Sequence, residues 1–325
     1  MEQAEVNSRF SYSIWRLIMM GSLSIILYMS IFMSVLTPYP VALVFVLFGR
    51  HKGFIVAGLT TAVFYILVQQ GSKDIFLIGI FIFAMLVALG LSEVIYRKIT
   101  PVKGILVMGM SFIVLGSAGL FSYQQSSGVK IREIVLGNIE KLKPMFDQQI
   151  NEIRKSNSEN ALELEAYLKQ PQVMTDDIMK QGPSAIIMSV FVVLWANMFL
   201  LLKSNRILNQ KADTSYSEKI LIQFRVPEQL IIGVIIGLIM AMWGDVLGEW
   251  GPTMGITLLK VLGVFYFFQG FGIYVDFLDH VRIFGFLRSI LVVLTVLTAH
   301  EMLALIGLFD MFVNFRKFLK KKDHI

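Results

Sequence analysis

The chain contains no cysteine, and only 16% of its 325 residues are charged. Without cysteine it has no disulfides, no thiolate metal ligands and no thiol nucleophile. Soluble proteins carry about 25% charged residues, so the low charge content argues against a soluble fold. The histidines are scattered along the chain instead of clustered, and we therefore expect no metal site; they are His51, His280, His300 and His324.

The short motifs of several enzyme classes are also missing. The chain has no G-x-x-x-x-G-K-[ST] loop for a nucleoside triphosphate, no G-x-S-x-G nucleophile and no H-E-x-x-H zinc motif. Gly270 and Gly272 form at most half of a dinucleotide fingerprint, and their place in an apolar run favours close helix packing instead. We therefore predict that the protein is not an enzyme and holds no cofactor.

Apolar residues, in contrast, are abundant: they make up 56% of the chain, and the mean hydropathy is +0.69. A helix of about 20 apolar residues crosses a bilayer. We predict an all-α, polytopic transmembrane helix bundle of about nine to ten membrane segments, in contact with the lipid bilayer. The expected segments are 14–36, 40–48, 53–70, 75–96, 102–123, 184–202, 229–247, 253–277 and 282–313.

We expect four regions along the chain. They are an N-terminal five-span membrane bundle over 1–123, a helical extracytoplasmic insert over 124–183, a C-terminal membrane bundle over 184–314 and a basic tail over 315–325. The second span is short and follows Pro38 and Pro40. Because irregular backbone at membrane depth must be buried in protein, we expect this segment inside the bundle.

The polar insert has apolar residues at helical spacing, which predicts amphipathic helices. Pro144 and Thr175 are expected to start helices. We favour a solvated cap over the bundle, and a ligand lid or a docking element for a partner is the alternative.

Lys and Arg residues gather beside three loops, as orientation signals do. They place the loops around 50–52, 97–103 and 203–225 in the cytoplasm, and with them the N-terminus. We predict a multi-pass protein of the bacterial cytoplasmic (inner) membrane. The net charge of +6 then reflects orientation, and we expect no nucleic-acid partner. The first apolar run lacks a small-x-small cleavage site, so we expect it to remain as a span.

The last predicted segment breaks the alternation of sides, because a single crossing would leave the basic tail outside. His300 and Glu301 interrupt this apolar stretch. We therefore favour two short helices in a hairpin that returns the tail to the cytoplasm. One long tilted helix with an external tail is the alternative.

Polar residues inside apolar spans are costly, so they indicate a partner or a cavity. Gln269 and Asp276 share one face of span eight, within a run rich in aromatic residues that includes Tyr274. An apolar pocket with a few convergent polar groups is typical of small-ligand sites. We predict Gln269, Asp276 and Tyr274 as ligand contacts. The alternative for Gln269 is a hydrogen bond to a neighbouring helix.

Two more polar residues are candidates. Asn197 in span six is a predicted ligand contact, with hydrogen bonding between helices as its alternative. Glu301 is the deepest acidic candidate, a possible charge partner for a cation, a proton or a ligand amine. If the last segment is a hairpin, Glu301 lies at its tip, near water.

Small residues recur every four positions in two spans, a pattern that lets a second helix approach closely. We predict helix packing at Gly233, Gly237 and Ala241 in span seven and, more weakly, at Ser30 and Ser34 in span one.

Several short motifs resemble those of the YybS-like family of predicted bacterial membrane proteins, whose function is unknown. They are Thr37-Pro38-Tyr39-Pro40, Gly49-Arg50-His51-Lys52-Gly53, Phe224-Arg225-Val226-Pro227, Tyr266-Phe267-Phe268-Gln269-Gly270 and Gly307-Leu308-Phe309-Asp310. The layout of the N-terminal half is also similar to that of the substrate-binding S components of energy-coupling-factor transporters. That likeness implies a separate ATPase and a coupling subunit as partners. S components have fewer spans and no large external insert, so the chain departs from them in both respects.

Our leading functional hypothesis is a small-molecule-binding, S-component-like transport subunit without its own ATPase. Its ligand would be a vitamin-like or other apolar and aromatic solute. The alternative is a non-transporting membrane scaffold or assembly partner, which docks other proteins or a second copy through the insert and the small-residue face of span seven.

Overall fold

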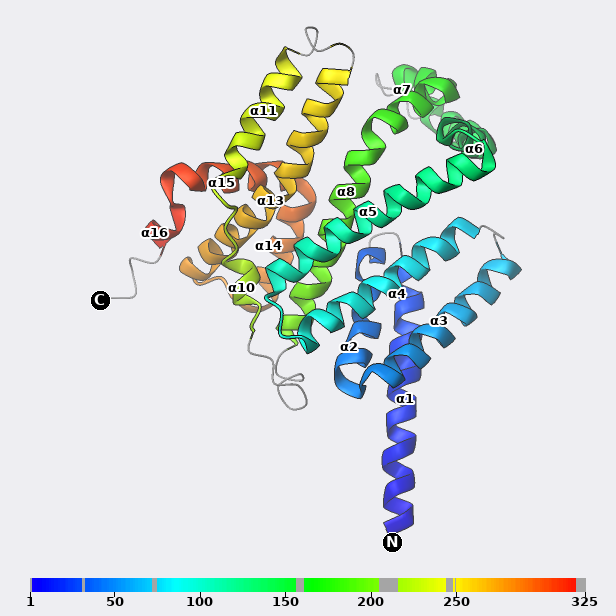
Figure 1. Cartoon of the computed structure of the whole chain (residues 1–325), viewed down its shortest axis with the longest axis vertical. Helices are drawn as coiled ribbons and strands as arrows, with labels where there is room; N and C mark the ends of the chain where they lie inside the picture. The colour runs from blue at the N-terminus through cyan, green and yellow to red at the C-terminus, as the bar shows by residue number, and fades with distance from the viewer. Residues whose placement is uncertain are drawn as a thin grey trace. The chain divides into compact units, whose positions relative to one another are not determined.

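The computed structural model describes residues 2–30, 33–71, 75–155, 161–204, 216–243, 248 and 250–319. All regular structure in these ranges is helical, which confirms the all-α prediction (Figure 1). The chain folds into two compact units. The first comprises 1–110, 190–228 and 263–325, and the second comprises 111–189 and 229–262.

The predicted number of nine to ten membrane segments is wrong for the described part of the chain. Five helices there are long and apolar enough to cross a membrane, or six if a bent pair near the C-terminus counts as one broken span. The five are α3 (Arg50–Gln70), α4 (Ile75–Tyr96), α5 (Pro101–Ser127), α8 (Pro171–Lys203) and α13 (Trp250–His280).

The other predicted spans correspond to shorter apolar helices. The first predicted span holds the apolar helix Ile14–Met29, the second coincides with the helical stretch Ser34–Phe48, and the seventh with α11 (Leu230–Met242). Residues 31–32 and 244–247, at the ends of the first and seventh predicted spans, lie outside the described residues. The 13 residues of α11 extend about 20 Å at 1.5 Å per residue, less than the roughly 30 Å of hydrocarbon.

The short second segment forms α2 (Pro38–Phe48), which packs against α1 (Glu2–Met29), α3 and α4 in the first unit (Figure 1). Pro38 occupies its first position, where a missing N–H costs nothing. Residues 40–46 are all buried. This confirms the expectation that the segment lies inside the bundle, and it makes α2 the core of the N-terminal helices.

Two side chains hold the turn before α2 in place. Ser24 of α1 donates a hydrogen bond to the Thr37 carbonyl at 3.0 Å, and Asn197 of α8 donates to the Val35 carbonyl at 2.8 Å. Because α1 ends at Met29 and η1 (Ser34–Leu36) follows, Ser30 and Ser34 do not share one helix as the sequence pattern suggested. Ser24 of α1 is fully buried.

The last apolar stretch is broken in two. The helices α14 (Gly285–Thr298) and α15 (His300–Val313) meet at Ala299 with a bend of 92°. Each has 14 residues, too few to cross the hydrocarbon alone. The predicted interruption at His300 is therefore confirmed, and the alternative of one long helix is wrong. The short α16 (Phe315–Leu319) follows, and residues 320–325 of the basic tail lie outside the described residues.

The insert is helical, with α6 (Ile131–Lys155) and α7 (Ala161–Leu168) in the second unit. Two predicted helix starts are wrong. Pro144 lies inside α6, and α8 begins at Pro171, one turn before Thr175. The Thr175 hydroxyl donates instead to the Pro171 carbonyl at 2.7 Å. In the described range the insert therefore continues directly into α8, without a separate helix start.

Within the second unit, α11 packs closely on the N-terminal half of α13 through small residues. A methyl group added at Gly255 would collide with the backbone of Ala241 and Gly237, and one added at Gly237 would press on Leu259. Gly233 faces Leu262. The small-residue stripe of α11 thus lies against a helix of the same chain.

We expect Gly255→Ala to destabilise the protein, because its new methyl group would force the two backbones apart at a cost of about 1–3 kcal/mol. The measurement is thermal unfolding in detergent. Gly263→Ala is the matched control, because it lies in the same helix with nothing within 4 Å of the added methyl group. Equal melting temperatures for the two variants would contradict the close packing.

Candidate functional site

Aromatic side chains of α8 and α13 interlock in the first unit. The Trp195 ring stacks on Phe268, with centroids 5.0 Å apart and planes at 7°, and meets the edge of Phe271 at 4.8 Å. One turn earlier on α8, Phe191 contacts Phe265 edge to face at 5.0 Å. Aromatic pairs in these geometries add stability beyond the area they bury. They fix the separation of the two helices.

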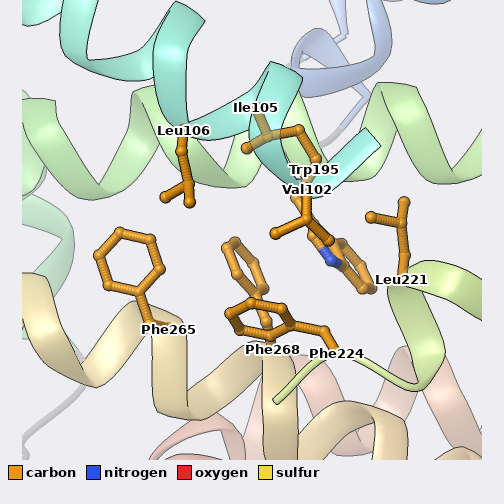
Figure 2. Close-up of a pocket in the computed structure, with 8 residues that line it drawn as sticks. All are labelled: Val102, Ile105, Leu106, Trp195, Leu221, Phe224, Phe265 and Phe268. Carbon is orange, nitrogen blue, oxygen red and sulfur yellow. The ribbon is translucent and has the colours of Figure 1, made fainter. Parts of the chain in front are cut away.

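A pocket lies beside this aromatic cluster, within the first unit (Figure 2). Its cavity volume is about 20 Å³. Whole small-molecule sites usually have about 300–1,000 Å³, so the pocket has room for about one water-sized group, such as a carbonyl oxygen of a larger ligand. Its lining comes from four segments of the chain. They are α5 with Val102, Ile105 and Leu106, α8 with Trp195, α10 (Lys219–Ile222) and the residues after it with Leu221 and Phe224, and α13 with Phe265 and Phe268.

The pocket contains one unused polar group. Trp195 is 8% exposed, and its indole N–H has no hydrogen-bond partner. Figure 2 shows the indole nitrogen on the side of the ring that faces the other lining side chains. Buried polar groups are nearly always paired, so a donor without an acceptor marks a place that a ligand or a water can satisfy.

Gln269 lies on α13 behind this aromatic cluster and joins three segments. Its amide oxygen accepts a hydrogen bond from the Val226 backbone N–H at 2.7 Å, and its amide nitrogen donates to Asp310 at 2.9 Å. It is 2% exposed. Both ends of the amide are therefore occupied by the protein itself, and the alternative role of Gln269, a hydrogen bond to another helix, is the one that the structure displays.

Arg316 completes this junction. Its guanidinium donates to the carbonyls of Ile222, Gln223 and Phe224 at 2.8–3.2 Å. The carbonyls at the end of a helix such as α10 have no partner within it, so the arginine caps them. Arg316 is 3% exposed, and its Nε lies 3.5 Å from a carboxylate oxygen of Asp276, an ion pair without a hydrogen bond.

The charge of Arg316 is balanced from two sides. Burial lowers the pKa of Arg316 from its usual value, and the carboxylates of Asp276 and Asp310 act in the opposite direction. We call Gln269, Asp276, Asp310 and Arg316 the polar clamp. It holds residues 222–226, the segment that supplies Phe224 to the aromatic pocket, against α13.

Glycines allow this close arrangement. A methyl group at Gly270 would collide with the Leu303 carbonyl, and one at Gly307 would collide with the Tyr266 carbonyl. One at Gly272 would collide with the Ile222 carbonyl. Helices α13 and α15 therefore cross with their backbones in contact at Gly270 and Gly307. Only glycine permits the approach that brings Gln269 within hydrogen-bonding distance of Asp310.

The predicted ligand contacts separate into different places. Gln269 and Asp276 both contact Arg316, but Tyr274 accepts a hydrogen bond from Thr295 of α14 at 2.9 Å. Asn197 ties α8 to the turn before α2, through the Val35 carbonyl. Glu301 is exposed in the first turn of α15. None of the five lines the aromatic pocket.

Sequence reasoning missed three residues that matter here. Arg316 was assigned to the basic tail, because a positive-inside signal and a buried capping arginine have the same sequence appearance. Asp310 lies in an apolar stretch, three residues after Gly307, and that spacing on one helix face was an available signal. Trp195 gave no signal, because an isolated tryptophan in a span reads as a packing residue.

A second, larger pocket lies at the ends of the N-terminal helices. Its cavity volume is about 370 Å³, which falls at the lower end of the range of small-molecule sites. Tyr28 and Phe64 pack edge to face in its wall at 4.8 Å, and the Tyr28 hydroxyl donates to the Leu77 carbonyl at 2.8 Å. The lining residues are Tyr28, Met29, Phe64, Leu67, Val68, Gly71 and Leu77.

Among the residues that the structure describes, no group of three or more His, Asp or Glu side chains is placed to hold a metal ion.

We expect Arg316→Gln to destabilise the protein by about 3 kcal/mol, because it leaves the buried Asp310 and the half-buried Asp276 without their cation and three carbonyls without a donor. Thermal unfolding in detergent measures the effect. Lys317→Gln is the control, because the neighbouring Lys317 is exposed. A melting temperature for Arg316→Gln equal to that of the control would show that the polar clamp contributes nothing to stability.

A family model described as a predicted membrane protein, DUF2232, matches residues 13–311. Comparison with curated proteins and with solved structures gives no match.

Proposed function

The chain belongs to the DUF2232 family of predicted membrane proteins, and we propose that it is a small-molecule-binding transport subunit, of the S-component type, that depends on a separate ATPase. The observation that carries the proposal is the N-terminal pocket, with a volume of about 370 Å³ at the ends of α1 and α3 and the start of α4. A site of this size holds a small solute.

The predicted orientation supports a role in uptake. With the N-terminus in the cytoplasm, the end of α1, the end of α3 and the start of α4 all belong to the outer side. The pocket is then accessible to a solute that arrives from outside. Its lining side chains are largely apolar and include two aromatic rings, those of Tyr28 and Phe64. These walls favour an apolar or aromatic solute with few hydrogen-bonding groups.

The absence of a phosphate-binding loop supports the dependence on a partner. A chain without such a loop does not bind a nucleoside triphosphate in that way, so energy for uptake would come from another subunit. The scaffold alternative has less support. The small-residue face of α11, which it would use for docking, already packs against α13 in the same chain.

The proposed ligand site is the N-terminal pocket, which differs from the ligand contacts predicted from the sequence. Gln269 and Asp276 serve the polar clamp, and Asn197 and Tyr274 hydrogen-bond to the protein itself. A ligand that bound to these side chains would have to replace their hydrogen bonds within the protein, which would destabilise the fold. In the N-terminal pocket the Tyr28 hydroxyl also donates to the Leu77 carbonyl, but the other lining side chains are apolar and have no such hydrogen bond to lose.

We expect Leu67→Trp to abolish ligand binding without harming the fold, because Leu67 lines the pocket yet is 43% exposed, so a larger ring fills the space. The measurement is a thermal-shift screen of small aromatic and apolar solutes in detergent. A ligand at a hundred times its Kd stabilises a protein by about 2.7 kcal/mol. Compounds that raise the melting temperature of the wild type should have no effect on Leu67→Trp.

Leu59→Trp is the matched control, because Leu59 lies on the same helix, is 63% exposed and does not line the pocket. It should respond to ligands as the wild type does. The proposal is overturned if every active compound stabilises Leu67→Trp and Leu59→Trp equally, or if no compound stabilises the wild type.

The partner is tested separately, by native mass spectrometry of the protein after gentle extraction from its own membrane. We expect a complex that contains an ATPase subunit. A homogeneous homo-oligomer, or a complex with proteins that bind no nucleotide, would instead favour the scaffold alternative.

A further inference from the structure

The aromatic pocket beside Trp195 differs in character from the N-terminal one. It is small, its wall is almost wholly apolar, and the single polar group that we identify there is an indole N–H with no acceptor. A group that satisfies it must bring one hydrogen-bond acceptor attached to apolar atoms. A carbonyl on a hydrocarbon chain meets both requirements.

Basic residues flank the pocket in three of the segments that form it. Lys103 follows Val102 at the start of α5, Lys219 begins α10 two residues before Leu221, and Arg225 follows Phe224. All three side chains are exposed. The pocket therefore combines an apolar interior with a positively charged margin, a combination that fits an anionic head group on an apolar chain.

The depth of the pocket agrees with this chemistry. Lys103 and the residues from 216 to 225 belong to loops that the Lys and Arg pattern assigns to the cytoplasmic side. Tryptophan is enriched at the same level of membrane proteins, where one end of the ring is apolar and the N–H meets polar groups. The ester carbonyls of phospholipids lie at this boundary between head groups and hydrocarbon.

We propose that the Trp195 pocket binds an anionic phospholipid. The indole N–H of Trp195 donates to an ester carbonyl whose oxygen enters the cavity, the adjoining acyl chain lies against the apolar wall, and Lys103, Lys219 and Arg225 attract the phosphate. The polar clamp has a positioning role here. Arg316 and Gln269 hold residues 222–226, and so fix Phe224 in the pocket wall and Arg225 at its margin.

This site is separate from the one in the proposed function, because the two pockets share no lining residue. Loss of lipid binding at Trp195 would leave solute binding at Leu67 intact, and the reverse also holds. A negative result for one site therefore leaves the proposal for the other site unaffected.

The test is native mass spectrometry of the purified full-length protein, titrated with phosphatidylglycerol and phosphatidylcholine of identical acyl chains. We expect the wild type to prefer phosphatidylglycerol. Trp195→Phe keeps the aromatic stacking and removes the N–H, so it should weaken binding of both lipids by about fivefold, the worth of one hydrogen bond. Trp243→Phe is the control, because Trp243 is 65% exposed and lies outside the pocket.

A second pair of variants tests the head group. Lys103→Gln combined with Lys219→Gln should reduce the preference for phosphatidylglycerol and leave phosphatidylcholine binding unchanged. Lys180→Gln, an exposed lysine of the second unit, should change neither. The proposal is overturned if Trp195→Phe binds both lipids as tightly as the wild type, if the double lysine variant keeps the full preference, or if the wild-type pocket retains an aromatic solute in place of lipid.

Discussion

The contact between α13 and α15 at Gly270 and Gly307 is the constraint on which the C-terminal part of the first unit depends. With the two backbones touching, Gln269 reaches Asp310, and Arg316 reaches the carbonyls that end α10. In an apolar surrounding an amide, a carboxylate or a guanidinium is tolerated only with its partners in place. The two glycines thus make the hydrogen bond between Gln269 and Asp310 possible, and the polar clamp holds residues 222–226 against α13.

The intramembrane polar residues fall into two groups with opposite meanings. Some, such as Gln269 and Tyr274, form hydrogen bonds with other groups of the protein and so stabilise the fold. Trp195 keeps an unused donor in an apolar pocket, and such an unsatisfied group is the more informative sign of a ligand. The cost of polarity in a membrane shows that a residue has a partner, but only its contacts show whether that partner is the protein or something else.

The predicted number of spans was too high because hydropathy measures composition and not helix length. Segments such as 229–247 are largely apolar, yet α11 covers only 13 residues before Trp243. The stretch from 282 to 313 contains enough apolar residues for one long helix, but it turns by 92° at Ala299. Short helices of this kind are stable in an apolar setting when other helices cover them, as α1, α3 and α4 cover α2.

The sequence by itself determined that the chain is a membrane protein, in contact with lipid, and that its secondary structure is helical. A chain with 56% hydrophobic residues, long apolar runs and prolines at the helix start of α2 has few alternatives to a helical membrane protein. It also indicated the break at His300 and the close-packing role of Gly270. Only the tertiary structure decided which polar residues are partners. Asp310 and Gln269 are 41 residues apart, and Arg316 meets carbonyls more than 90 residues away. The physical reason is that hydropathy and spacing describe one helix at a time, whereas a hydrogen bond between distant segments depends on how closely two backbones pack.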